Sequence, residues 1–247
     1  MAYDFGFANI YDKFTDASDV RERADFITEA LRRFGAAEGI LLDLACGTGR
    51  LSEAFILAGY DVISVDYSAE MLQQAKERLQ KYGAKALVLQ QDMRELDLFG
   101  TIGAAVCSMD GINHLLAPED VRQVFGKVAL FTEPGGVFIF DVNTVYKHRH
   151  VLADNTFVYE DETDFLIWQN EYCAEDDTVQ MLLDTFSVRE DCAYERYSDE
   201  ITERAYELED IEDMLKDAGF SEVYRFADRS FDAPGEDEER VYFTAIR

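Results

Sequence analysis

The stretch Leu41–Gly49, which reads LLDLACGTG, carries residue types that suit a nucleotide-cofactor turn. Asp43 lies near the end of an apolar run, and Ala45, Gly47 and Gly49 follow at alternate positions. Small residues at such positions let the backbone approach a ligand without a clash at Cβ. The start of the following helix offers free N–H groups. Taken alone, this turn fits NAD, FAD, a phosphate group or S-adenosylmethionine.

Two further acids follow predicted strands and narrow this choice. Asp66 ends the apolar run DVISVD, where a carboxylate can accept hydrogen bonds from both ribose hydroxyls. Asp92 follows the next strand directly, in QQDM. A carboxylate there can accept a hydrogen bond from an adenine amino group, with Met93 packing on the ring.

The run Ser108-Met109-Asp110 ends the fourth predicted strand, opposite the first turn, so Ser108 and Met109 are further candidate cofactor contacts. Strands one to four thus each end in an acid. An anionic dinucleotide would meet repulsion there, whereas a cofactor with a sulfonium and an ammonium group would meet less. The dinucleotide motif also needs a third glycine, and Ser52 occupies that position. These features favour S-adenosylmethionine and leave NAD as an alternative.

The elements that must position these residues alternate along the chain. Strand-like apolar runs are followed by helical periodicities that end at glycines. Five such alternations predict an open, doubly wound, mostly parallel sheet that binds its ligand at the carboxyl ends of the strands. The expected strands are 40–45, 61–66, 85–91, 102–109 and 135–142, and the expected helices are 19–35, 50–58, 68–82 and 118–131.

The sequence texture changes after Asp141. Residues 156–206 show period-two patterns rich in aromatic and β-branched residues, which predict an antiparallel insertion with a hairpin turn at Asp176-Asp177. A helix over 207–218 and two strands over 220–227 and 239–247 complete the chain. We therefore expect one domain over 1–247, with an N-terminal lid and helix region over 1–35. The insertion, 144–206, is expected to form a lid or one wall of the substrate pocket.

With these motifs the chain resembles the class I S-adenosylmethionine-dependent methyltransferases. LDLACGTG matches the glycine motif of the family, with Ala45 replacing its first glycine. Asp66 and Asp92 match its ribose-binding and adenine-binding acids, and EVYRF with RVYFTAI matches the antiparallel hairpin that closes its seven-stranded sheet. Within the family, SMDGINHL and the insertion look like bacterial small-molecule methyltransferases, including N-methyltransferases of glycine and amino sugars. IYDKF resembles their lid, which implies that Tyr11 covers the cofactor.

Four side chains have both a functional and a structural interpretation. His114 follows the fourth strand, where a general base would suit N- or O-methylation. It could equally be a histidine bonded to the backbone at a helix start. Tyr11 is a candidate lid and catalytic residue by the resemblance alone. Tyr67 and Met71 are candidate cofactor contacts or packing residues.

Bulk composition excludes several classes of function. The net charge of −28 and the lack of a basic footprint argue against a nucleic-acid substrate. No apolar run approaches the ~20 residues of a membrane helix, and the N-terminus does not read as a secretory signal. The four cysteines show no CxxC spacing, so no metal site is predicted, and a cytoplasmic location is expected.

The sequence thus predicts methyl transfer from S-adenosylmethionine to a nitrogen or oxygen of a small molecule by direct displacement. A nicotinamide-dependent oxidoreductase and a non-catalytic cofactor-binding module are the alternatives. The identity of the acceptor and the oligomeric state stay open.

Overall fold

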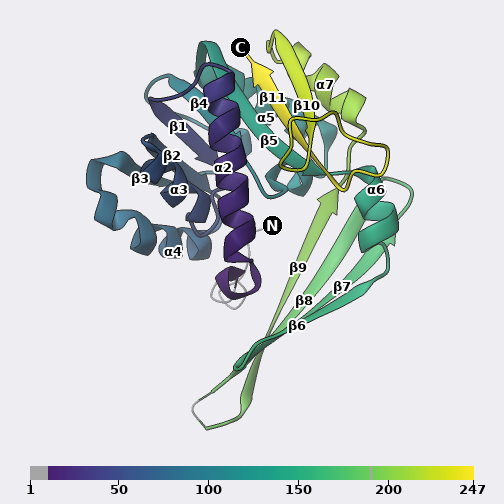
Figure 1. Ribbon diagram of the computed structural model, residues 1–247. Helices are drawn as coiled ribbons and strands as arrows, with labels where there is room; N and C mark the ends of the chain where they lie inside the picture. Colours follow the sequence, from purple (N-terminus) through teal and green to yellow (C-terminus); the bar gives the residue numbers. More distant parts are fainter. Residues whose placement is uncertain (1–10, 190) are drawn as a thin grey trace.

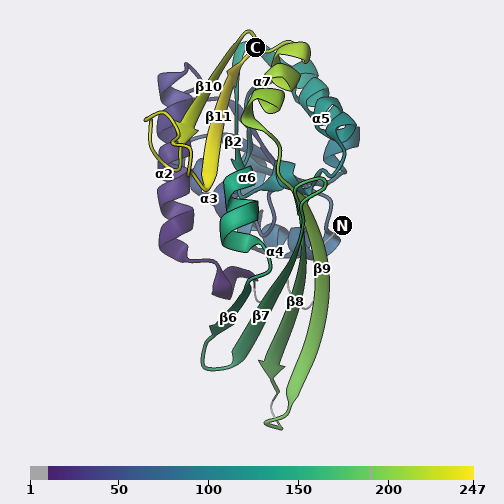
Figure 2. The ribbon, with the colours of Figure 1, turned by 90° about the vertical axis from the view of Figure 1, so that its right-hand side faces the viewer.

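The computed structural model describes residues 11–189 and 191–247, so the first ten residues of the expected N-terminal lid region lie outside it. The chain forms a layered α/β body from which a second, smaller sheet projects (Figure 1). Turned by 90°, the body shows its large sheet between α2 and the pair α5 and α7 (Figure 2).

Seven strands form the large sheet, in the order β10-β11-β5-β4-β1-β2-β3. All neighbouring pairs from β5 to β3 are parallel, whereas β11 is antiparallel to both β5 and β10. This confirms the predicted doubly wound, mostly parallel sheet with its closing hairpin. The strands are β1 (Ile40–Leu44), β2 (Asp61–Asp66), β3 (Ala86–Gln90), β4 (Ile102–Cys107), β5 (Thr132–Asn143), β10 (Glu222–Ala227) and β11 (Arg240–Ile246).

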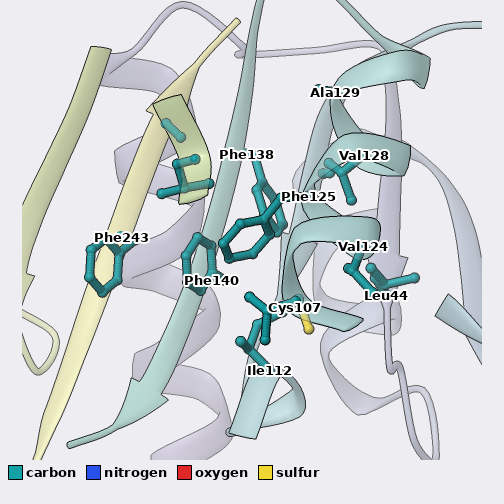
Figure 3. Packing of buried hydrophobic residues seen from close by; sticks show 14 of the residues in the cluster. Leu44, Cys107, Ile112, Val124, Phe125, Val128, Ala129, Phe138, Phe140 and Phe243 are labelled. Carbon is teal, nitrogen blue, oxygen red and sulfur yellow. The ribbon is translucent and has the colours of Figure 1, made fainter. Parts of the chain in front are cut away.

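Helices cover both faces of this sheet because successive strand residues point to opposite faces. Leu41 belongs to the cluster under α2 (Ala17–Arg33) and α3 (Arg50–Ala58). Leu42 belongs to the cluster under α5 (Pro118–Phe131) and α7 (Leu208–Asp217). In the second cluster Phe125, Phe138, Phe140 and Phe243 form a continuous aromatic layer (Figure 3), and the rings of Phe140 and Phe243 stack at 5.1 Å.

The third predicted helix, expected over 68–82, differs from its prediction. It was expected to run to Tyr82, but α4 (Ala69–Leu79) ends earlier and passes into the 3₁₀ segment η1 (Gln80–Lys85). Gly83 adopts φ +59° within that segment, a conformation that cannot continue a right-handed helix. The remaining short segments are η2 (Met93–Glu95), η3 (Gly111–His114), α6 (Val145–Lys147) and η4 (His148–Leu152).

The predicted antiparallel insertion lies between β5 and α7 and is a four-stranded meander. Its strands are β6 (Thr156–Glu160), β7 (Asp164–Cys173), β8 (Thr178–Val188) and β9 (Tyr194–Arg204), in that spatial order. One face forms a core cluster that includes Val179, Met181 and Leu183 together with Met71 of α4, and Tyr11 packs against it. The small sheet is therefore seated beside the carboxyl ends of the large sheet's strands.

Candidate active site

A cavity of about 540 Å³ opens where strands β1, β2 and β4 end. Its walls come from the glycine turn, from the segments after β2, β3 and β4, and from the N-terminal segment before α2. Of the thirteen side chains or turn positions singled out from the sequence, all but Gly49 line this cavity. They are Tyr11, Asp43, Ala45, Gly47, Asp66, Tyr67, Met71, Asp92, Met93, Ser108, Met109 and His114.

The glycine turn depends on left-handed backbone at alternate positions. Ala45, Gly47 and Gly49 have φ values of +59°, +53° and +78°. Gly49 precedes α3 and lies against α4, where an added Cβ would come within 3.1 Å of the Ala75 Cβ. Gly49 therefore permits close helix packing behind the turn, while Ala45 and Gly47 form the cavity wall.

Asp43 is almost fully buried beneath this turn, with 2% of its surface exposed. Its carboxylate accepts a hydrogen bond from the Ser52 hydroxyl, which in turn accepts one from Ser64 at 2.8 Å. Burial raises the pKa of Asp43 to about 7. Ser52, at the position of the third glycine in the dinucleotide motif, thus has a role here as the partner of Asp43.

Asp66 joins the tip of β2 to the glycine turn. Its two carboxylate oxygens accept hydrogen bonds from the backbone N–H groups of Gly47 and Ser68, each at 2.8 Å. Burial raises the pKa of this carboxyl above its usual range. Each oxygen has a second lone pair, so the fixed carboxylate can still accept hydrogen bonds from a ligand in the cavity.

Asp92 is held by the side chain of Arg94, a residue that the sequence analysis did not identify as part of the site. Its carboxylate caps η2 and forms an ion pair with Arg94, whose Nε lies 3.0 Å from one carboxylate oxygen. The hydrogen bonds from Arg94 lower the pKa of Asp92. Arg94 also reaches Asp120 of α5, at 3.1 Å. Asp92 therefore lines the cavity with its charge already paired by Arg94.

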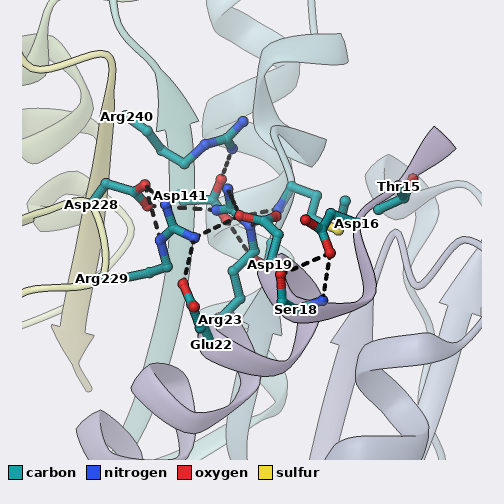
Figure 4. A network of polar contacts seen from close by, with 12 residues as sticks. Thr15, Asp16, Ser18, Asp19, Glu22, Arg23, Asp141, Asp228, Arg229 and Arg240 are labelled. Carbon is teal, nitrogen blue, oxygen red and sulfur yellow. Dashed lines mark hydrogen bonds and ion pairs between the residues drawn. The ribbon is translucent and has the colours of Figure 1, made fainter. Parts of the chain in front are cut away.

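The tip of β4 depends on two residues that sequence reasoning missed, Asp141 and Arg240. Asp141 accepts hydrogen bonds from the Ser108 hydroxyl and from the backbone N–H groups of Met109 and Asp110. Arg240 of β11 pairs with the fully buried Asp141 and also with Asp110. Figure 4 shows this contact beside the neighbouring arginine cluster of α2 and the β10–β11 loop. The only sequence signal was that Asp141 interrupts an apolar strand.

The two catalytic candidates, Tyr11 and His114, both line the cavity. Burial raises the pKa of the Tyr11 hydroxyl. His114 ends η3, and its Nε2 lies 3.9 Å from Oε1 of Glu203, a residue of β9 that has only 3% of its surface exposed. Sequence reasoning missed Glu203, because in the period-two pattern of β9 it reads as one more strand residue.

Tyr67 and Met71 both contact the cavity but differ in burial. Tyr67 is 57% exposed, whereas Met71 is 1% exposed and belongs to the core cluster under the small sheet. Met71 is therefore a packing residue that also lines the cavity. Within residues 11–189 and 191–247, no cluster of ligating side chains fit for a metal ion is found, and no helix has the length and apolarity to span a membrane.

A doubly wound sheet with a glycine turn and carboxylates at its strand tips defines an enzyme class that binds nucleotide-type cofactors. A family model described as a methyltransferase domain matches residues 41–136. A putative methyltransferase of Bacillus subtilis, YqeM, is 34% identical over 97% of this chain and 95% of its own length. The chain belongs to the class I S-adenosylmethionine-dependent methyltransferases, and S-adenosylmethionine is its cofactor.

Two further similarities concern structure and chemistry. A crystal structure of an S-adenosylmethionine-dependent methyltransferase from Clostridium acetobutylicum superposes with a TM-score of 0.87, at 33% identity and 97% coverage of both chains. A glycine/sarcosine N-methyltransferase of Halorhodospira halochloris is 35% identical over 139 residues, which span 55% of this chain and 51% of that protein. These similarities support a methyltransferase. They do not support the two alternatives from the sequence, a nicotinamide-dependent oxidoreductase and a non-catalytic cofactor-binding module.

Proposed function

We propose that this enzyme methylates a nitrogen or oxygen atom of a small organic molecule by direct displacement. The observation that supports this most strongly is that the candidate cofactor acids and His114 line one cavity of about 540 Å³. The similarity to a glycine/sarcosine N-methyltransferase favours nitrogen. The net charge of −28 disfavours nucleic acid as the acceptor.

The residues at the strand tips fit S-adenosylmethionine. Asp66 is half-buried and fixed by two backbone donors, so its remaining lone pairs suit the ribose hydroxyls. Asp92 and Met93 suit the adenine, although Asp92 must share its carboxylate with Arg94. The remaining predicted positions suit the methionine portion and the outer wall of the cofactor site: Asp43, Ala45, Gly47, Tyr67, Met71, Ser108 and Met109.

When bound, S-adenosylmethionine supplies an electrophilic methyl group on a sulfonium. The protein's own contribution is to orient the acceptor, exclude water and receive a proton. His114 would take the proton that the acceptor nitrogen or oxygen loses. Tyr11 would cover the cavity, and the insertion over 144–206, which packs with Tyr11 and Met71, would form a lid or one wall of the substrate pocket within a single domain.

Asp66→Ala tests the cofactor site by isothermal calorimetry with S-adenosylhomocysteine. We expect the dissociation constant to rise more than tenfold, which corresponds to about 1.4 kcal/mol or more. Asp61→Ala is the matched control, because Asp61 is an exposed acid at the opposite end of the same strand. Unchanged affinity in Asp66→Ala would remove this residue from the cofactor site.

Transfer of labelled methyl from S-adenosylmethionine tests the reaction itself, with a panel of small amines and a fractionated metabolite extract as acceptors. We expect label in an amine, and we expect His114→Asn to slow its appearance at least tenfold while S-adenosylhomocysteine affinity stays within twofold. Label found only in nucleic acid would contradict the proposed acceptor class. Full activity of His114→Asn would remove its role as the base.

A further inference from the structure

Behind His114 lies a buried carboxylate with histidines on two sides. Glu203 belongs to β9, the inner edge of the insertion, and is 3% exposed. Its Oε1 lies 3.9 Å from Nε2 of His114, and its Oε2 lies 3.6 Å from Nε2 of the fully buried His148. A buried carboxylate needs paired charges or hydrogen-bond donors, so the groups around Glu203 must supply them.

The other contacts of Glu203 fix its position and its charge. The Asn143 amide donates to Oε2 at 2.9 Å, and the oxygen of the same amide accepts from Lys147 at 2.8 Å. Nδ1 of His148 faces the carbonyl oxygen of Asp177 at 3.0 Å. Because a carbonyl oxygen only accepts, Nδ1 carries a proton and His148 directs Nε2 toward Glu203.

Burial alone would keep Glu203 neutral, but its partners outweigh burial. Desolvation raises its pKa, whereas the neighbouring rings of His148 and His114 and the hydrogen bond from the Asn143 amide lower it below its usual range. Glu203 is therefore an anion at neutral pH. The titratable groups that face it are His114 from η3, His148 from η4 and Lys147 from α6.

Hydrogen bonds between the residues next to Glu203 and His114 in the chain also fix the distance between these two side chains. Asn113, which precedes His114, donates from its side-chain amide to the carbonyl oxygen of Arg204, which follows Glu203, at 2.9 Å. The same amide group also donates to the Asn143 backbone at 3.0 Å. This places the last turn of η3 and the end of β9 in a fixed register on either side of the His114–Glu203 contact.

We propose that Glu203 is a positioning residue for His114. Its carboxylate accepts a hydrogen bond from Nε2–H of the neutral imidazole, so Nδ1 holds the lone pair that receives the proton lost by the methyl acceptor. The carboxylate then stabilises the imidazolium and does not itself take a proton, as in other carboxylate–histidine pairs. The separation of 3.9 Å exceeds a hydrogen bond, and such contacts often shorten only when substrate is bound. The catalytic part of this role rests on the proposed function.

Histidine NMR tests the pairing without any acceptor, because the chain contains only three histidines. We expect the titration midpoint of His114 to fall by about 0.5–1 pH unit in Glu203→Gln. Glu200→Gln, an exposed change on the same strand, is the control and should leave it unchanged. Glu203→Asp, which keeps the charge, should restore part of the shift. Asp66, the other carboxylate that acts on His114, is intact in all three variants.

A shift below 0.2 pH unit in a folded Glu203→Gln protein would overturn the proposal. If that variant does not fold, the ¹⁵N spectrum of the wild-type protein decides the matter. A neutral His114 protonated on Nε2 supports the pairing, and one protonated on Nδ1 overturns it. If Glu203→Gln shows the expected shift of His114 but His114→Asn keeps full methyl transfer, the pairing is supported. The role of His114 as the base in the proposed function is then refuted.

Discussion

The large and small sheets differ in how they relate to the cavity. Strands of the large sheet are covered by helices on both faces, and segments at their carboxyl ends line the cavity, where Gly47 of the glycine turn holds Asp66. The small sheet packs one face against Met71 and Tyr11 and leaves Val158 58% exposed at its edge strand. We propose that the first sheet supplies the cofactor site, and that the second supplies a cover and one buried carboxylate, Glu203, near His114.

Charged pairs in the two sheets show the same contrast. Arg240 of β11 is 11% exposed and bridges Asp110 and the fully buried Asp141. Arg196 of β9 is 57% exposed where it pairs with Asp184 at 2.7 Å. Ion pairs that are removed from water cost much to break, whereas solvent-exposed ones contribute little.

The largest effect should come from Arg240→Met. Loss of the guanidinium leaves Asp141 buried without its counter-charge, so we expect the free energy of unfolding to fall by about 3–5 kcal/mol. The matched change in the small sheet, Arg196→Met, should cost about 1 kcal/mol or less. Urea denaturation measures both. Equal losses in the two variants would contradict the contrast between the sheets.

A smaller, pH-dependent effect is expected from Asp43→Asn in the protein without added cofactor. The pKa of Asp43 is raised from 3.8 to about 7 in the folded chain. Protonated Asp43 therefore stabilises the fold fully below pH 4, and this contribution is lost as the pH rises through 7. The variant should gain about 1 kcal/mol relative to the wild type between pH 6 and pH 8.

Thermal or urea unfolding at both pH values measures this change. The exposed control Asp61→Asn should show no such difference. A stability gain for Asp43→Asn that is the same at pH 6 and at pH 8 would contradict a pKa of about 7 for the Asp43 carboxyl.

The smallest effect should come from Asp92→Ala, measured as affinity for S-adenosylhomocysteine. Asp92 is partly exposed and shares its carboxylate with Arg94, so its bond to a ligand should contribute about 1 kcal/mol or less. We expect the dissociation constant to rise about fivefold or less. A larger loss than that of Asp66→Ala would reverse the ranking of the two acids within the large sheet.

The two sheets also differ in how well the sequence predicts them. In the large sheet, buried strands and helices alternate with sharp glycine stops, so strand positions and tip acids follow from periodicity. Periodicity did not predict the partners of those acids. Arg94, Asp141 and Arg240 interact through side-chain geometry that the spacing of residues in the sequence does not reveal.

In the small sheet, the period-two pattern over 156–206 predicted antiparallel strands, and the last of its segments, EITERAY, begins at Glu200. The strand β9 begins six residues earlier, at Tyr194, because residues 194–199 also pair along β8. Glu203 could not be assigned to the site, since its partner His114 lies 89 positions earlier in the chain and the two meet only after the insertion folds back.

We propose that the large sheet binds the cofactor, while the small sheet acts on the acceptor side of the reaction through Glu203. Calorimetric titration of S-adenosylhomocysteine into the wild-type protein, Asp66→Ala and Glu203→Gln tests this division directly. The division predicts an affinity loss of more than tenfold in Asp66→Ala and a change within twofold in Glu203→Gln. Comparable losses in both folded variants, or no loss in Asp66→Ala, would contradict it.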